Sequence, residues 1–92
     1  MIIRIMGEGQ FEVPGSLFDE LNIIDNRIVE LVAKENEADY RTELSRLINV
    51  IKSNGKQLDD ASIVESNIIV PPEDLSLQEA KEIFTGSGLL ED

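Results

Sequence analysis

The chain has 92 residues, of which 41% are hydrophobic and 29% charged, and its formal net charge is −11. It contains neither cysteine nor histidine, which excludes disulfides, thiolate metal sites and a cysteine nucleophile, and removes the commonest general base. The negative charge opposes binding to nucleic acids and to anionic membrane surfaces. From the length we expect one small acidic domain, residues 1–92, and from the missing residue types we expect that it is not an enzyme.

The first predicted element is a β-hairpin of Ile2–Met6 and Gln10–Val13. If Gly7-Glu8-Gly9 is a three-residue loop, Gly9 supplies the left-handed backbone that such a loop favours at its last position. A dinucleotide-binding fingerprint would need a third glycine and a following helix, whereas strand residues follow here. The loop predicts three cross-strand pairs: Ile5 with Phe11, Ile3 with Val13, and Arg4 with Glu12.

Two amphipathic helices are predicted next. Ser16 can cap the first, which should end near Lys34–Asn36, and the second should run from about Ala38 to Ser53 before Gly55. So short a link predicts an antiparallel helical hairpin. Apolar residues recur at helical spacing on one face of each helix: Leu17, Leu21, Ile24, Ile28 and Leu31 in the first, and Tyr40, Leu44, Leu47, Ile48 and Ile51 in the second.

The remaining residues, 56–92, predict a loop, a strand and a helix. Residues Lys56–Ser66 are mostly polar, and Asn67–Val70 forms a short strand stopped by Pro71-Pro72. Ser76 and Glu79 have capping-box spacing and predict a helix over about Leu77–Phe84, ended by Gly86 and Gly88, after which Leu89-Leu90 should fold back. The expected fold is α+β in the order ββααβα, with the hairpin and third strand packed against the helical hairpin and a short C-terminal helix.

Several acidic residues near the third strand are of the type that binds Ca²⁺ or Mg²⁺ through oxygen ligands. Their spacing does not match a calcium-binding EF-hand loop, and acidic side chains of an acidic protein are usually only solvated. The candidate ligands are Asp59, Asp60, Glu65, Glu73 and Asp74.

Three apolar residues lie off the main stripes of the two long helices: Ile23, Val29 and Val50. One interpretation is that they flank the core or contact the third helix. The other is that they form an exposed patch for another protein or for a second copy in a homodimer.

No apolar run approaches the ~20 residues that a membrane span requires, and the N-terminus lacks the pattern of a signal peptide. We therefore expect a cytoplasmic protein without direct membrane insertion. Any action at the inner face of the membrane would depend on a partner.

Four stretches, taken together, resemble the PspA-associated protein family (PspAA): IIRIMGEGQFEV, LFDELNIIDNRIVELV, YRTELSRLINVIKSNG and IIVPPEDLSLQEAKEIFTGSGLL. The resemblance covers nearly the whole chain, from Ile2 to about Leu90. Its most specific parts are Arg4–Phe11, Leu21–Asp25, and the run from Pro71-Pro72 through Asp74, Ser76 and Glu79 to Gly88-Leu89.

The resemblance implies a non-catalytic adaptor or regulator of PspA, a peripheral membrane coiled-coil protein of the phage-shock and envelope-stress response. It implies no catalytic residue and no cofactor. A domain of charge −11 suits a basic protein partner better than a lipid surface. The alternative is a small acidic protein that binds a divalent cation through the candidate carboxylates.

Overall fold

The structure, a computed structural model, describes residues 1–59 and 64–84. It is an α+β fold whose four strands form one mixed sheet, with three α-helices and one 3₁₀ turn among the described residues. In chain order the elements are β1 (Ile2–Ile5), β2 (Gly9–Glu12), the 3₁₀ turn η1 (Gly15–Leu17), α1 (Phe18–Ala33), α2 (Glu37–Asn54), β3 (Lys56–Gln57), β4 (Ile68–Val70) and α3 (Leu77–Ile83).

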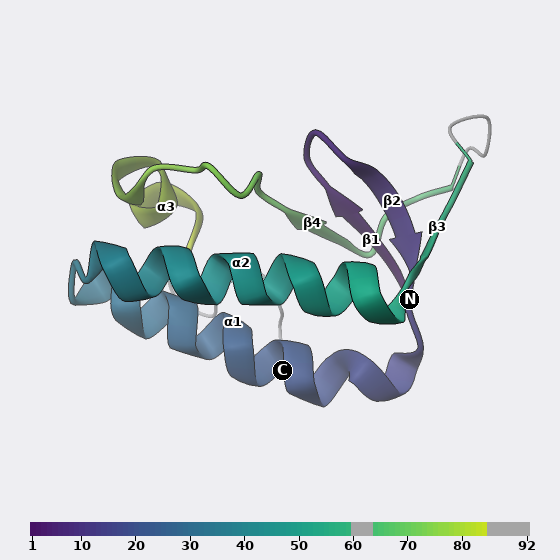
Figure 1. Ribbon diagram of the computed structural model, residues 1–92, viewed down its shortest axis with the longest axis horizontal. Coiled ribbons are helices and arrows are strands. Elements are labelled where there is room, and N and C mark those ends of the chain that lie inside the picture. The colour runs from purple at the N-terminus through teal and green to yellow at the C-terminus, as the bar shows by residue number, and fades with distance from the viewer. Residues whose placement is uncertain (60–63, 85–92) are drawn as a thin grey trace.

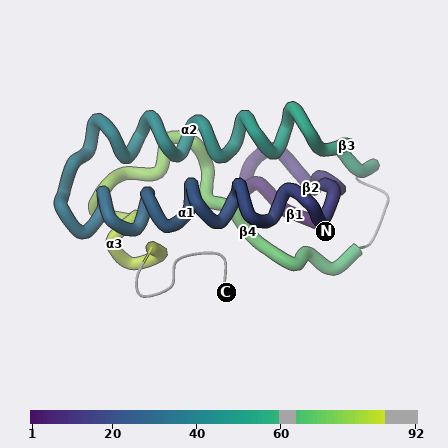
Figure 2. Tube along the Cα trace, turned by 90° about the horizontal axis from the view of Figure 1, so that it is seen from below, coloured from purple at the N-terminus to yellow at the C-terminus, as the bar shows by residue number. Residues whose placement is uncertain are grey.

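Helices α1 and α2 lie side by side and run antiparallel, forming the long base of the molecule (Figure 1). The sheet lies over the end of this base where α1 begins and α2 ends, and α3 lies over the opposite end. Viewed from below, the connection from β4 to α3 runs along the helical pair between these two ends (Figure 2). The predicted helical hairpin is therefore confirmed.

The hairpin of β1 and β2 forms as predicted, but its register is wrong by two residues. Ile3 pairs with Phe11 and Ile5 with Gly9, so that Arg4 lies opposite Gln10 instead of Glu12. The loop begins one residue earlier than predicted, because the N–H of Glu8 donates to the carbonyl of Ile5 at 2.9 Å.

Two glycines, and not one, shape this turn. Gly7 has φ 88° and Gly9 has φ 113°, conformations that residues with a Cβ rarely adopt. A shift of two residues leaves every side chain on its predicted face, because strand side chains alternate with a period of two. The predicted apolar face is thus confirmed, and all four of its members are buried: Ile3, Ile5, Phe11 and Val13.

The sheet has the order β3-β2-β1-β4, with β4 parallel to β1 and β3 antiparallel to β2. The predicted third strand corresponds to β4. The expectation of a loop from Lys56 onward is wrong at Lys56–Gln57, which adds a two-residue strand to the edge of β2. Gly55 permits this turn from α2, since a Cβ there would lie 2.7 Å from the carbonyl oxygen of Ile51 and from a methyl of Val13.

The first helix begins differently from the prediction. Ser16 lies inside η1, where the N–H of Leu17 donates to the carbonyl of Pro14 at 3.0 Å, so its hydroxyl does not cap α1. The 3₁₀ turn delays the start of α1 to Phe18. The caps of the other two helices follow side-chain chemistry: Asn36 accepts from the N–H of Asp39 at 3.3 Å, and Ser76 accepts from that of Glu79 at 3.1 Å, as predicted for the capping box.

The core lies between the sheet, the helical pair and α3. All five predicted core residues of α2 are buried, and in α1 Leu21, Ile24 and Ile28 are buried while Leu17 and Leu31 are half-buried. The predicted positions Asp60, Gly86, Gly88 and Leu89-Leu90 lie outside the described residues. The buried hydrophobic residues are Ile3, Ile5, Phe11, Val13, Leu21, Ile24, Ile28, Val32, Tyr40, Leu44, Leu47, Ile48, Ile51, Val70, Leu75, Ala80 and Phe84.

Candidate functional site

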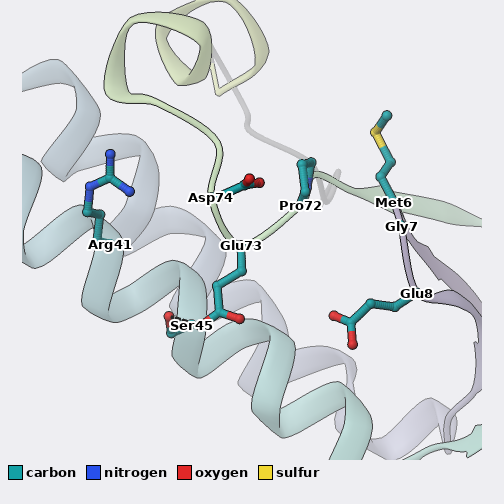
Figure 3. Close-up of a pocket in the computed structure, with 8 residues that line it drawn as sticks. All are labelled: Met6, Gly7, Glu8, Arg41, Ser45, Pro72, Glu73 and Asp74. Atoms are coloured by element: carbon teal, nitrogen blue, oxygen red, sulfur yellow. Dashed lines mark hydrogen bonds between the residues drawn. The ribbon is translucent and has the colours of Figure 1, made fainter.

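A groove with a volume of about 590 Å³ opens on the side of the molecule where three segments meet (Figure 3). One wall is the β1–β2 loop, the second is the exposed side of α2, and the third is the connection between β4 and α3. We call this feature the groove, and its lining residues are Met6, Gly7, Glu8, Arg41, Ser45, Pro72, Glu73 and Asp74.

The topology of the sheet brings the first and third walls together. Because β4 runs parallel to β1, both strands end at the same edge, and the N–H of Met6 donates to the carbonyl of Val70 at 2.9 Å. Pro71-Pro72 cannot donate to a sheet and end the pairing there. The chain then crosses above α2 toward α3, and thereby closes the groove on its third side.

The far end of this crossing segment is held by the only tyrosine of the chain. The Tyr40 hydroxyl donates to the carbonyl of Leu75 at 2.8 Å, and the ring is fully buried. Burial raises the pKa of the Tyr40 hydroxyl, because the phenolate would lose its hydration. Within the groove, the Ser45 hydroxyl donates to Oε1 of Glu73 at 2.8 Å and ties the same segment to α2.

The charged side chains of the groove differ in how far they are neutralised. Glu8 forms an ion pair with Lys52 of α2. In the part of the chain that the structure describes, Arg41 and Asp74 form no ion pair. The groove therefore offers both a guanidinium and a carboxylate to an outside ligand.

The lining of the groove combines charged, polar and apolar groups. The side chains can form hydrogen bonds and ion pairs, and Met6 adds an apolar surface with 51% of the residue exposed. Histidine and cysteine are absent from the sequence, so the groove contains neither the commonest general base nor a thiolate nucleophile.

Among the described residues, the predicted cation ligands do not gather into one cluster. Glu73 and Asp74 line the groove, whereas Asp59 and Glu65 lie on either side of residues 60–63, and Asp60 lies outside the described residues. Over residues 1–59 and 64–84, no three acidic side chains lie close enough together to hold a metal ion.

The predicted partner residues differ in exposure. Ile23 is 61% exposed on α1, while Val29 and Val50 are half-buried and pack against the core. None of the three lines the groove. Sequence reasoning missed Met6 and Arg41 as candidates, because a single methionine after a strand and a single arginine on a helix carry no pattern that points to a site.

The most specific segment of the family resemblance has a structural explanation. The glycines shape the β1–β2 turn, and the buried Gln10 side chain donates to the carbonyl of Val64 and the hydroxyl of Ser66, both at 2.7 Å. This segment therefore fixes one wall of the groove and anchors the chain that leads into β4.

No helix within the described ranges is both long and apolar enough to cross a membrane.

No curated protein and no solved structure gives a significant match to the chain. A family model described as PspA-Associated protein matches residues 1–92, and this is not a known family of enzymes. The match covers the whole chain, which therefore belongs to the PspA-associated protein family, PspAA.

Proposed function

We propose that this chain is a non-catalytic adaptor that binds a PspA-like peripheral membrane coiled-coil protein and tunes its assembly in the envelope-stress response. The observation that carries the proposal is the family match over all 92 residues. In this proposal the chain works in the cytoplasm and reaches the inner face of the membrane only through its partner.

Electrostatics supports a protein partner over a lipid surface. A net charge of −11 repels the anionic lipids of the inner leaflet, whereas it accelerates encounter with a partner that carries exposed lysine and arginine. The groove supports the same conclusion, because a wide and open groove lined in part by charged side chains suits side chains of another protein better than a buried small molecule.

The test is direct binding between this chain and the PspA homologue of the same genome. Tagged chain should co-purify with that homologue and bind it in a titration calorimeter, with an affinity that falls as salt is raised, because opposite charges attract. An unrelated coiled-coil protein of similar net charge is the control. Absence of binding to the homologue, or equal binding to the control, would refute the adaptor proposal.

A further inference from the structure

We infer that the groove is the docking surface for one helix of the partner coiled coil, and that it recognises a basic and an acidic side chain on the exposed face of that helix. This inference rests on the proposed function and adds where the contact is made and by which chemistry. The basic side chain meets Asp74, and the acidic one meets Arg41.

The two unpaired charges are the first step. Arg41 projects from α2 at one side of the groove. The Asp74 carboxylate points away from Arg41 and toward Pro72 (Figure 3). Both residues are exposed, and neither forms an ion pair with a residue that the structure describes. A partner that supplies the opposite charge at both positions is fixed in orientation, since reversing it would place like charges together.

The second step is the rigidity of the walls. The third wall is held by Pro71-Pro72, by the hydrogen bond from Ser45 to Glu73 and by that from Tyr40 to Leu75. The backbone that carries Asp74 is thus held in place before a partner arrives. A preformed surface loses less conformational entropy on binding than a flexible one does.

The third step is Met6, which is exposed at the edge of the groove. A methionine has a flexible and polarisable side chain that adapts to the apolar stem of a partner residue. Met6 therefore adds apolar contact beside the charged groups of the groove, and protein interfaces usually combine the two.

The occupant follows from these features. A coiled coil buries its apolar seam and displays alternating acidic and basic side chains on its outer surface. A groove with both signs of charge matches such a surface, and the excess of carboxylates in the whole chain favours a partner face on which lysine and arginine dominate.

The test uses charge reversals in the full-length chain, titrated against the PspA homologue of the same genome. Asp74→Lys removes the contact with the basic side chain and should weaken binding by about 10-fold or more. Glu20→Lys makes the same charge change on α1, which contributes no residue to the groove, and should change the affinity by less than about 2-fold.

Arg41→Glu separates local contact from net charge. It adds two negative charges to an already acidic chain, so attraction governed by net charge alone would strengthen binding to a basic partner. Docking in the groove predicts weaker binding, again by about 10-fold, because the acidic side chain of the partner then faces a carboxylate. The melting temperature of each variant checks that folding is unchanged.

Two results would overturn the inference, and they differ in whether the adaptor proposal survives. If the wild-type chain binds but Asp74→Lys and Glu20→Lys weaken binding equally, or Arg41→Glu strengthens it, the groove is not the docking surface, although the adaptor proposal survives. If the wild-type chain does not bind the homologue at all, both the adaptor proposal and this inference fail.

Discussion

The buried core and the groove are built from the same elements. Within one element, a residue of the core is followed directly by a residue of the groove. Ile5 of β1 is fully buried, while Met6, the next residue, lines the groove; on α2, Leu44 is fully buried and Ser45 lines the groove. One face of each element thus supplies the packing that stabilises the fold, and the adjacent position faces the groove. The groove can therefore change with little effect on folding, whereas the interior cannot.

The pair Leu44 and Ser45 tests this separation with the largest expected effect. Leu44→Ala opens a cavity in the core and should lower the free energy of unfolding by about 2–5 kcal/mol. Ser45→Ala removes only a half-exposed hydrogen bond to Glu73 and should cost about 0.5 kcal/mol. Urea denaturation monitored by circular dichroism measures both. Equal losses for the two variants would show that the groove lining contributes to the core.

The glycines at positions 55 and 15 give the next largest contrast. Gly55→Ala places a Cβ 2.7 Å from a backbone oxygen and from Val13, in a space that cannot relax cheaply, and should cost about 1–3 kcal/mol. Gly15→Ala meets nothing within 4 Å and should be neutral or stabilising by up to about 1 kcal/mol. Thermal denaturation of both variants checks the contrast. If Gly15→Ala were destabilised as much as Gly55→Ala, the close approach of the added Cβ at position 55 would not explain the loss of stability.

Tyr40 connects the two regions, because it is buried in the core and holds the segment that forms a groove wall. Tyr40→Phe leaves the Leu75 carbonyl without its donor and should cost about 1–2 kcal/mol. Since the folded pKa is raised above the ordinary value of 10.0, the wild-type chain should lose stability as the pH rises from about 10 through the folded pKa.

Absorbance of tyrosinate reports on this group alone, since the chain has one tyrosine and no tryptophan. Tyr40→Phe should lack the part of the alkaline loss of stability that Tyr40 contributes. An ordinary tyrosine titration in the folded chain would contradict the buried hydrogen bond.

The smallest expected effect lies outside both regions, at Glu35. This residue follows α1 with φ 57°, and the N–H groups of Glu35 and Asn36 donate back to Val32 and Leu31 in a pattern that glycine usually occupies. Its side chain forms an exposed ion pair with Lys81 of α3. We expect Glu35→Gly to raise the melting temperature slightly, because the backbone strain outweighs a solvent-exposed ion pair. Glu35→Gln, which keeps the strain, is the control, and a larger loss for Glu35→Gly than for Glu35→Gln would contradict this account.

Elements that depend on nearby residues were predictable from the sequence. The helical stripe of α2 and the cap at Ser76 are local patterns, and the structure confirms both. The start of α1 was missed because Ser16 satisfies a capping pattern that a 3₁₀ turn overrides. Strand β3 was missed because two residues are too short to show alternation, and its existence depends on the free edge of β2.

The hairpin register and the groove needed three-dimensional information for different reasons. The register depends on whether the turn begins at Met6 or at Gly7, and the sequence permits either because both Gly7 and Gly9 tolerate positive φ. The groove depends on three segments that lie far apart in the sequence, and the parallel pairing of β1 with β4 brings the first and the third of them together. The sequence marked Glu73 and Asp74 as candidate cation ligands, but nothing in it placed them beside Arg41.

The central claim is that the groove is the surface through which this chain binds its PspA partner. The most direct measurement is a nuclear magnetic resonance titration of the ¹⁵N-labelled chain with the PspA homologue of the same genome, read residue by residue at the backbone amides. The account predicts that the largest changes in shift or intensity fall on residues 6–8, 41–45 and 73–74, with little change at exposed Ile23. Changes centred on Ile23 and the outer face of α1, or no changes at saturating partner, would contradict it.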